Sequence, residues 1–516
     1  MIEGLEKRRE GRRGGRRRDR GDAPARKVDY RSLRHPFPAV PVFSEDRVEA
    51  IHDMALRTLE DLGIKILLPE ARALFRKAGA LVDDETQMVR IGREIVTSAL
   101  ASAPRQFTIR AGAAHRDVQL ELGHLTIQSG AGCPNVTDLV GGRRPGSLAD
   151  FEDLVQLIQS YDVLHMVGPA TEPQDVDPAV RHYATMRTIL RRSDKVPFVY
   201  SRGPVQVADA FEMLRIGRDL SKDAFEAEPR CYTIINTNSP RQIDIPMAQG
   251  LIDFARSRQV SVVTPFCLMG AMAPVSIAGA LVLSHAEALA GIALTQIARP
   301  GAPVCYGAFV SNVDLKSGAP AFGTPEQVKA NLAAGQLARK LGLPWRCAAG
   351  CAANINDAQA AHETQMSAWG AMLAGCTILV HGAGWIEGGL TLSFEKLITD
   401  LETMQVFAEL CAPTPVDDAE LAFDALQEVA PGGHFFAAAH TMERYQTAFY
   451  EPLVADWSNF GTWTERGAKD ANARATEIWK SRLAKPVESH LPEDRSAALD
   501  RFIATRTAEG GAPPVS

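Results

Sequence analysis

The chain has 516 residues, of which 46% are hydrophobic and 23% charged, and its mean hydropathy is −0.10. These values are ordinary for a globular protein. The sequence has no uninterrupted apolar run of about 18 residues, so no transmembrane helix is predicted. The net charge of −6 is unevenly distributed, because residues 1–34 hold 13 Lys/Arg and 6 Asp/Glu while the rest of the chain has a balance of −13. An acidic body argues against the binding of polyanions as its main task.

The first segment, residues 1–30, is rich in arginine and glycine. Like charges repel and glycine opposes packing, so we expect a disordered basic tail that stays solvated or meets an acidic partner, with nucleic acid as the alternative. No apolar stretch follows the arginines, as a secretory signal would require. Together with eight cysteines scattered through a long chain, this favours a reducing, cytoplasmic compartment.

Residues 31–123 are predicted to form an N-terminal helical region. Ser44 is a suitable cap for a helix with an apolar stripe that ends at Gly63. Two further helices are expected near 69–78 and 92–102, followed by a strand near 106–110.

Residues 124–412 show a different rhythm, in which short β-rich apolar runs alternate with helical patterns. The runs lie at 125–128, 163–167, 196–200, 232–235, 260–264, 304–307, 345–349 and 377–380. Helical patterns follow them near 148–160, 178–192, 205–219, 243–257, 276–298, 325–341, 357–374 and 394–411. Eight strand–helix units predict an α/β fold of the (β/α)8 TIM-barrel type. A doubly wound open sheet is the alternative, although no Gly-x-Gly-x-x-Gly motif follows the first strand.

Residues 413–516 are predicted to be a C-terminal appendage. It contains the segment Pro431-Gly432-Gly433-His434-Phe435 and a helical pattern near 467–484. We expect residues 505–516 to be frayed, as chain ends commonly are.

The active site of a barrel lies at the carboxyl ends of its strands. Polar and aromatic residues gather after the predicted strands: Cys133, Asn135, Asp138, Glu172, Ser201, Arg202, Asn236, Thr237, Asn238, Phe266, Met269, Phe309, Asn312, Asp314, Asn354, Asp357, Gln359, His381, Trp385 and Glu387. Their convergence on one rim indicates a ligand pocket.

Structural roles are the alternatives for several of these residues. Asn236 and Asn238 have the properties of turn residues, and Asp357 those of a helix cap. In the same way, Glu172 could be a solvent-exposed surface residue and His381 a buried core histidine with no role in ligand binding.

Several kinds of catalytic machinery are absent from the sequence. It has no P-loop, no His-Glu-x-x-His and no Gly-x-Ser-x-Gly motif. No lysine occurs between Lys340 and Lys396, which argues against a Schiff-base aldolase. His381 is the only histidine near a strand end, so no metal site is predicted. The loops after strands five, seven and eight consist of small residues, which either leave the mouth of the barrel open or allow tight packing.

Motifs along the whole chain resemble the trimethylamine methyltransferase family. The resemblance covers about residues 30–485 and rests on these segments: Tyr306-Gly307-Ala308-Phe309, Asp314-Leu315-Lys316-Ser317-Gly318, Gly323-Thr324-Pro325-Glu326, Gln336-Leu337-Ala338-Arg339, Leu341-Gly342-Leu343-Pro344, Asp357-Ala358-Gln359-Ala360, Leu373-Ala374-Gly375, Ser393-Phe394-Glu395 and Gly433-His434-Phe435.

The resemblance implies a TIM-barrel methyltransferase that moves a methyl group from a methylated amine to the Co(I) of a corrinoid. Members that use trimethylamine carry pyrrolysine, for which this chain has no counterpart near Ala360. A small quaternary amine such as glycine betaine is therefore the expected donor. The chain contains no Asp-x-His-x-x-Gly cobalamin motif, so we expect a separate corrinoid protein as partner and no tightly bound cofactor. The family also implies a homo-oligomer.

With this chemistry in view, the candidate catalytic residues are Asp357, Gln359, Glu172 and His381. A methylammonium group is best held by aromatic faces and carboxylates, which makes Tyr306, Phe309, Phe266, Trp385, Glu387 and Asp314 candidates for substrate binding. A carboxylate on the substrate would be met by Arg202, Asn236, Asn238 or His381. Tyr306 and Phe266 equally suit barrel packing. The alternatives for the whole protein are a metal-dependent lyase or hydrolase, and a non-catalytic betaine-binding protein.

Overall fold

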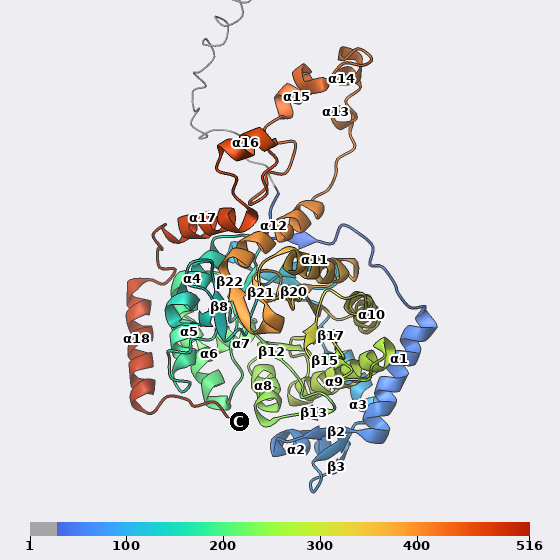
Figure 1. Ribbon diagram of the computed structural model, residues 1–516. Coiled ribbons are helices and arrows are strands. Elements are labelled where there is room, and N and C mark those ends of the chain that lie inside the picture. The colour runs from blue at the N-terminus through green and yellow to red at the C-terminus, as the bar shows by residue number, and fades with distance from the viewer. Residues whose placement is uncertain (1–27, 516) are drawn as a thin grey trace, which may run out of the picture. The chain divides into compact units, whose positions relative to one another are not determined.

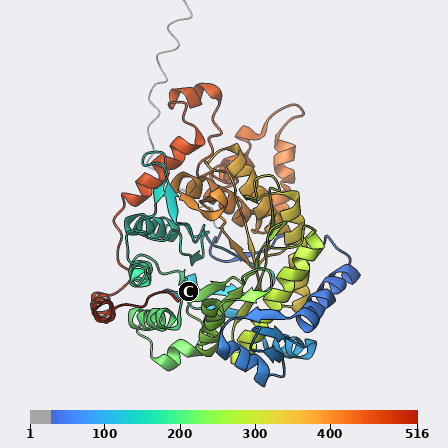
Figure 2. The ribbon, with the colours of Figure 1, turned by 60° about the horizontal axis from the view of Figure 1, so that its bottom comes forward.

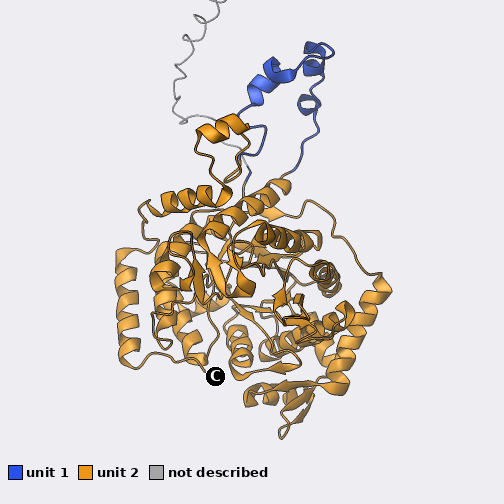
Figure 3. Cartoon of the chain, viewed as in Figure 1, with its two compact units in different colours: residues 1–28, 413–451 blue, residues 29–412, 452–516 orange. Residues whose placement is uncertain are grey.

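The structure is a computed structural model that describes residues 28–515. The basic tail predicted over residues 1–30 therefore lies almost wholly outside the described residues. The chain divides into a small unit containing Pro413–Glu451 and a large unit of Asp29–Ala412 with Pro452–Ser516 (Figure 3). The large unit is a mixed α/β structure, as predicted.

Eight parallel strands stand where the eight apolar runs predict them. Six form consecutive parallel ladders in the order β7 (His124–Ile127), β20 (Ile378–Val380), β19 (Trp345–Ala348), β16 (Val304–Gly307), β14 (Val260–Val263) and β12 (Tyr232–Ile235). The other two, β10 (Met166–Val167) and β11 (Val196–Pro197), pair with each other. Single parallel bridges join Gln128 to Met166 and Phe198 to Tyr232, so β10 and β11 lie between β7 and β12. The short β1 (Leu33–Arg34) pairs antiparallel with β7.

Helices surround these strands (Figures 1 and 2). They lie where the helical periodicity predicts them: α4 (Leu148–Gln159), α5 (Arg181–Arg192), α6 (Pro204–Arg218), α8 (Ile245–Arg256), α9 (Ile277–Ala298), α10 (Pro325–Leu341), α11 (Ala358–Leu373) and α12 (Phe394–Leu410). Local capping explains where they begin, because Ser147 and Asp150 form a reciprocal capping box at α4, and Thr324 and Asp357 cap α10 and α11.

The helix α9 is long and apolar enough to cross a membrane by length and composition, although polar residues interrupt its apolar sequence. In the structure it is a core helix, with 78% of its most apolar window buried. It packs against α8 and against two N-terminal helices, α1 (Glu45–Arg57) and α3 (Arg93–Ser102). A helix that is apolar on all sides is expected in such a position.

The N-terminal region contains the three predicted helices, including α2 (Pro69–Lys77), and also a small sheet that the sequence did not predict. Its strands are β2 (Ile64–Ile66), β4 (Met88–Arg90), β3 (Leu81–Asp83) and β13 (Gln242–Ile243), the last of which comes from the loop after β12. The strand predicted near 106–110 is β5 (Phe107–Ile109), which pairs with β6 (Val118–Leu120). Side chains of this hairpin pack beneath the parallel strands, in one apolar cluster with Met166, Tyr232 and Val260.

Short elements follow the carboxyl ends of the parallel strands and were expected to be loops. They are β8 (Asn135–Thr137), β9 (Arg144–Pro145), β15 (Phe266–Met269), β17 (Phe309–Val313), β18 (Pro320–Ala321), β21 (Trp385–Ile386), η3 (Glu387–Gly389) and β22 (Thr391–Ser393). They form one sheet in the order β15-β17-β18 and another in the order β21-β22-β8-β9.

The C-terminal part of the large unit contains α16 (Phe460–Glu465), α17 (Ala471–Leu483) where a helix is predicted, and α18 (Glu493–Ala508). The prediction that residues 505–516 fray is wrong for the described ones. The amide of Ala512 donates to the carbonyl of Ala179, and the amide of Val515 to that of Arg202. The small unit consists of α13 (Asp418–Leu421), α14 (Phe423–Glu428), η4 (Phe435–Ala437) and α15 (Ala439–Arg444).

Candidate active site

A cavity of about 490 Å³ lies at the carboxyl ends of the parallel strands. This volume is in the range of pockets that hold small organic ligands. Its walls combine apolar, aromatic and charged side chains from loops after seven of the strands and from within β12 and β19: Ala131, Gly132, Pro169, Glu172, Phe198, Tyr200, Ser201, Arg202, Ile234, Asn236, Thr237, Asn238, Asp244, Met247, Phe266, Phe309, Arg346, His381, Trp385, Gly388 and Gly389.

The structure brings eight of the thirteen candidate residues together in this cavity. They are Glu172, Arg202, Asn236, Asn238, Phe266, Phe309, His381 and Trp385. The other five, Asp357, Gln359, Tyr306, Asp314 and Glu387, do not line it.

Three of these five are engaged elsewhere by local structure. Asp357 is exposed and caps α11, with its Oδ1 accepting from the amide of Ala360 at 3.1 Å. Gln359 is exposed and donates to Glu363 at 2.7 Å. Asp314 is exposed and accepts from the backbone and hydroxyl of Ser317 in a turn. The alternative of a helix cap, which the sequence left open for Asp357, is the one observed.

The remaining two of the five, Tyr306 and Glu387, have partners that do not line the cavity. Tyr306 is buried against α9, and its hydroxyl is 3.1 Å from Nδ1 of His285. Glu387 pairs with Arg143 at 2.9 Å and directly precedes the two glycines that line the cavity. Glu387 therefore holds the loop, whereas Tyr306 belongs to the packing between strand and helix.

The carboxylate of Glu172 is already paired. Both of its oxygens accept hydrogen bonds from Arg202, and Nη1 of Arg181 lies 3.6 Å from Oε2. The guanidinium of Arg202 also lies over the ring of Tyr200, 4.8 Å from its centroid. Because the ion pair with Glu172 neutralises the charge of Arg202, Arg202 is less suited to bind a substrate carboxylate than the sequence suggests.

The aromatic residues Phe266, Phe309 and Trp385 form one side of the cavity, here called the aromatic wall. The centroid of Phe309 lies 4.9 Å from that of Phe266 and 6.2 Å from that of Trp385. Phe322 supports the wall from behind, 5.2 Å from Trp385. Such a surface of ring faces attracts a methylated ammonium group.

Arg346 and His381 lie beside the aromatic wall. Nη2 of Arg346 is 3.4 Å from Nε2 of His381, and the guanidinium lies over Phe309, 5.1 Å from its centroid. Burial of the ring, together with the charge of Arg346, holds the pKa of His381 well below its usual range. His381 is therefore a neutral imidazole at neutral pH, and its Nε2 faces a permanent donor.

The loop after β12 is held by a buried carboxylate. Glu287 of α9 accepts hydrogen bonds from the hydroxyls of Thr237 and Ser239 and from the amide of Arg241. Within the same loop, Asn238 exchanges two hydrogen bonds with Asp244. Asn236, which is exposed, is thus the loop's freer amide toward the cavity.

A sequence model described as trimethylamine methyltransferase matches residues 8–511 of this chain. The chain belongs to this family. A glycine betaine methyltransferase from Desulfitobacterium hafniense strain Y51 is 33% identical over 480 residues, which are 92% of this chain and 99% of the relative. A trimethylamine methyltransferase from another strain of that species is 28% identical over 91% of this chain and 94% of the relative. The solved monomethylamine methyltransferase of Methanosarcina barkeri superposes over 95% of each chain with a TM-score of 0.44 and 9% identity.

The family identifies the protein as a methyltransferase, and the cavity contains residues that the predicted set omits. The most prominent are Tyr200 and Arg346. A signal for Arg346 exists in the sequence, because it is the only charged residue in a strand that is otherwise apolar. A buried charge requires a partner, so such a residue is a site candidate.

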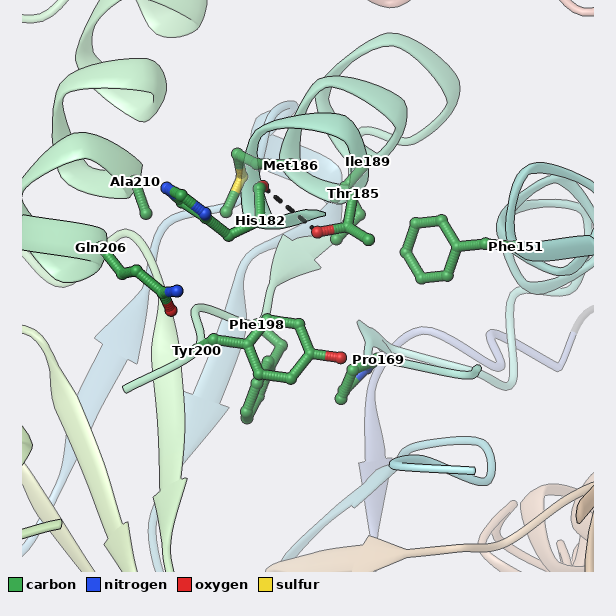
Figure 4. Close-up of a pocket in the computed structure, with 10 residues that line it drawn as sticks. All are labelled: Phe151, Pro169, His182, Thr185, Met186, Ile189, Phe198, Tyr200, Gln206 and Ala210. Carbon is green, nitrogen blue, oxygen red and sulfur yellow. Dashed lines mark hydrogen bonds between the residues drawn. The ribbon is translucent and has the colours of Figure 1, made fainter. Parts of the chain in front are cut away.

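A second, much smaller cavity of about 10 Å³ lies behind Pro169, Phe198 and Tyr200, which also line the main cavity. Figure 4 shows His182 and Tyr200 on its walls. Both ring nitrogens of His182 and the hydroxyl of Tyr200 are enclosed without a hydrogen-bond partner in the described part of the chain. The space suffices for about one water molecule, which is the usual way to satisfy such groups. Burial lowers the pKa of His182 to about 4.

Proposed function

We propose that this methyltransferase transfers a methyl group from a small quaternary amine of the betaine type to the reduced cobalt of a corrinoid, which a separate protein carries. The observation that supports it best is the aromatic wall beside a cavity that also holds carboxylates. Each ring face stabilises a methylated ammonium group by about 0.5–2 kcal/mol. The relative from strain Y51, named a glycine betaine methyltransferase, agrees with this donor class.

The reaction breaks one carbon–nitrogen bond. The bonding electron pair stays on nitrogen, which leaves as a neutral tertiary amine, and the methyl group bonds to the acceptor. No proton is required, and the cavity matches this, since His381 is neutral and Glu172 is paired. The task of the residues is to orient the carbon–nitrogen bond and to exclude water.

A corrinoid in its reduced state supplies the nucleophile that receives the methyl group. The residues at the cavity fit the approach of a bulky partner. A Cβ added at Gly132 would meet no atom within 4 Å, and one at Gly388 none within 3.8 Å, so these positions leave free space beside the cavity. Ala131 and Gly389 are the other small lining residues.

We further propose that the eight parallel strands close into a (β/α)8 barrel. The two bridges, Gln128 with Met166 and Phe198 with Tyr232, support this, because they connect β7 and β12, the outer strands of the six parallel ones, to the pair β10–β11. Residues 124–412 would then be the catalytic domain, with 31–123 and 413–516 as additions. A cytoplasmic homo-oligomer that binds its corrinoid protein completes the proposal.

The experiment offers the enzyme glycine betaine, proline betaine, carnitine, choline and trimethylamine with reduced cobalamin. The change in visible absorbance reports methylation, and the demethylated amine is identified by mass. We expect turnover with at least one quaternary amine and none with trimethylamine. If no quaternary amine is demethylated, either with free cobalamin or with the cognate corrinoid protein, the proposal is wrong.

A further inference from the structure

Arg346 is the most deeply buried charge that reaches the cavity. It lies in β19 and is 3% exposed. The other lining arginine, Arg202, has a side chain that is 40% exposed and lies in a loop. Burial lowers the pKa of Arg346 to about 10, so it remains a cation at neutral pH.

Within residues 28–515, no carboxylate forms an ion pair with Arg346, whose one polar contact is His381. Its Nε and Nη1 have no hydrogen-bond partner there either. Arg202 differs in this respect, because it pairs with Glu172. Burying an unpaired charge is unfavourable, and folded proteins normally offset its cost with a partner. Because Arg346 also lines the cavity, an anionic group bound there would lie next to this unpaired charge.

Resting on the proposed function, we propose that Arg346 binds the carboxylate of a zwitterionic methyl donor and that His381 positions its guanidinium. In a betaine, the carboxylate and the ammonium nitrogen are close enough to share one small cavity. The guanidinium of Arg346 and the aromatic wall are also close together, since Cζ of Arg346 lies 5.1 Å from the centroid of Phe309. The carboxylate then lies against the strand and the methyl groups against Phe266, Phe309 and Trp385, toward the strand ends where the acceptor approaches.

This arrangement selects against donors that lack a carboxylate. A purely cationic amine, such as choline, would bring a second positive charge next to Arg346 without neutralising it. A zwitterion satisfies both charges at once. Arg346 is thus a specificity residue. Its loss should change the ratio of the activity on glycine betaine to that on choline, and not lower both activities equally.

The experiment compares Arg346→Lys and Arg346→Met with the unmodified enzyme. For each protein, kcat and KM are measured with glycine betaine and with choline, and binding of both is measured by calorimetry without any corrinoid. The matched control is Arg218→Met, because Arg218 is a second arginine with a pKa lowered by burial to about 10, does not line the cavity, and donates to the backbone carbonyls of Arg110 and Lys195.

We expect Arg346→Met to raise KM and Kd for glycine betaine about 10- to 100-fold, as the loss of a charge-assisted hydrogen bond implies. Binding of choline should be unchanged or tighter, and Arg346→Lys should recover part of the betaine affinity. Arg218→Met should leave the betaine-to-choline ratio within about threefold of the unmodified enzyme. The ratio is an internal control, since partial unfolding lowers both activities together.

The inference is overturned if Arg346→Met weakens betaine and choline equally, or if the unmodified enzyme binds choline as tightly as glycine betaine. Failure of the proposed function has a different signature: glycine betaine binds in calorimetry and depends on Arg346, yet no donor is demethylated.

Discussion

The imidazole of His381 stacks on the indole of Trp385, with centroids 4.6 Å apart and ring planes inclined by 20°. His381 has a φ of 61°, a left-handed conformation that turns the chain directly after β20. The turn places the imidazole between Arg346 and Trp385. One residue with unusual backbone geometry thus connects the proposed carboxylate receptor to the aromatic wall.

Trp385 should contribute to donor binding through its ring face and not through its N–H. Its Nε1 has no hydrogen-bond partner within residues 28–515, so Trp385→Phe removes no hydrogen bond and keeps an aromatic ring at this position. We expect KM for glycine betaine to stay within about threefold in Trp385→Phe and to rise about tenfold in Trp385→Leu. Steady-state kinetics on both variants measure this. Equal KM values for the two variants would show that the aromatic face contributes nothing.

The backbone at His381 should tolerate asparagine better than valine. Asparagine adopts positive φ readily, whereas a β-branched residue there is strained. We expect the free energy of unfolding of His381→Val to be about 1–2 kcal/mol below that of His381→Asn. Urea denaturation of both variants gives the difference, and because both lack the imidazole, its lost contacts cancel. A difference below about 0.5 kcal/mol would contradict the strain.

The loop after β20 should depend on a buried ion pair. Nζ of Lys396 lies 2.7 Å from Asp400, whose other oxygen accepts from the amide of Gly384 at 2.9 Å. Asp400→Leu leaves the buried lysine unpaired and should lower the free energy of unfolding by about 3–5 kcal/mol. The double variant Lys396→Met, Asp400→Leu should recover most of this loss. Additive effects in the double variant would mean that the two charges do not interact.

Stability should fall on acidification, partly because of His182. Burial lowers its pKa from 6.5 to about 4, the charge of Arg506 adds to the lowering, and Asp209 opposes it. Between pH 6.5 and 4 the unfolded chain therefore binds the proton more readily than the folded one, so stability is lost as pH falls through this window. The contribution is roughly 3 kcal/mol at full effect.

The matched variant for this prediction is His182→Phe, which keeps a ring beside Tyr183 but cannot be protonated. Thermal unfolding from pH 7.5 to 4 should show a shallower loss of stability for the variant than for the unmodified chain. Identical pH slopes would show that His182 is not a neutral buried group.

The sequence by itself determined the order and position of the parallel strands and their helices. Hydrophobic periodicity and capping residues such as Ser147 and Thr324 depend only on residues that are close together in the sequence, so they can be recognised without the tertiary structure. The family resemblance was also readable from local motifs, and the sequence model that matches residues 8–511 confirms it.

Only the tertiary structure decided which residues share the cavity. Asp357 and Gln359 come after β19 as His381 comes after β20, but α11 uses Asp357 as its cap and leaves Gln359 on its surface. Arg346 was missed because a strand alternates its side chains between two faces. Whether Arg346 or its neighbour Trp345 points toward the cavity depends on the pairing of β19 with β16 and β20, and that register joins residues far apart in the chain.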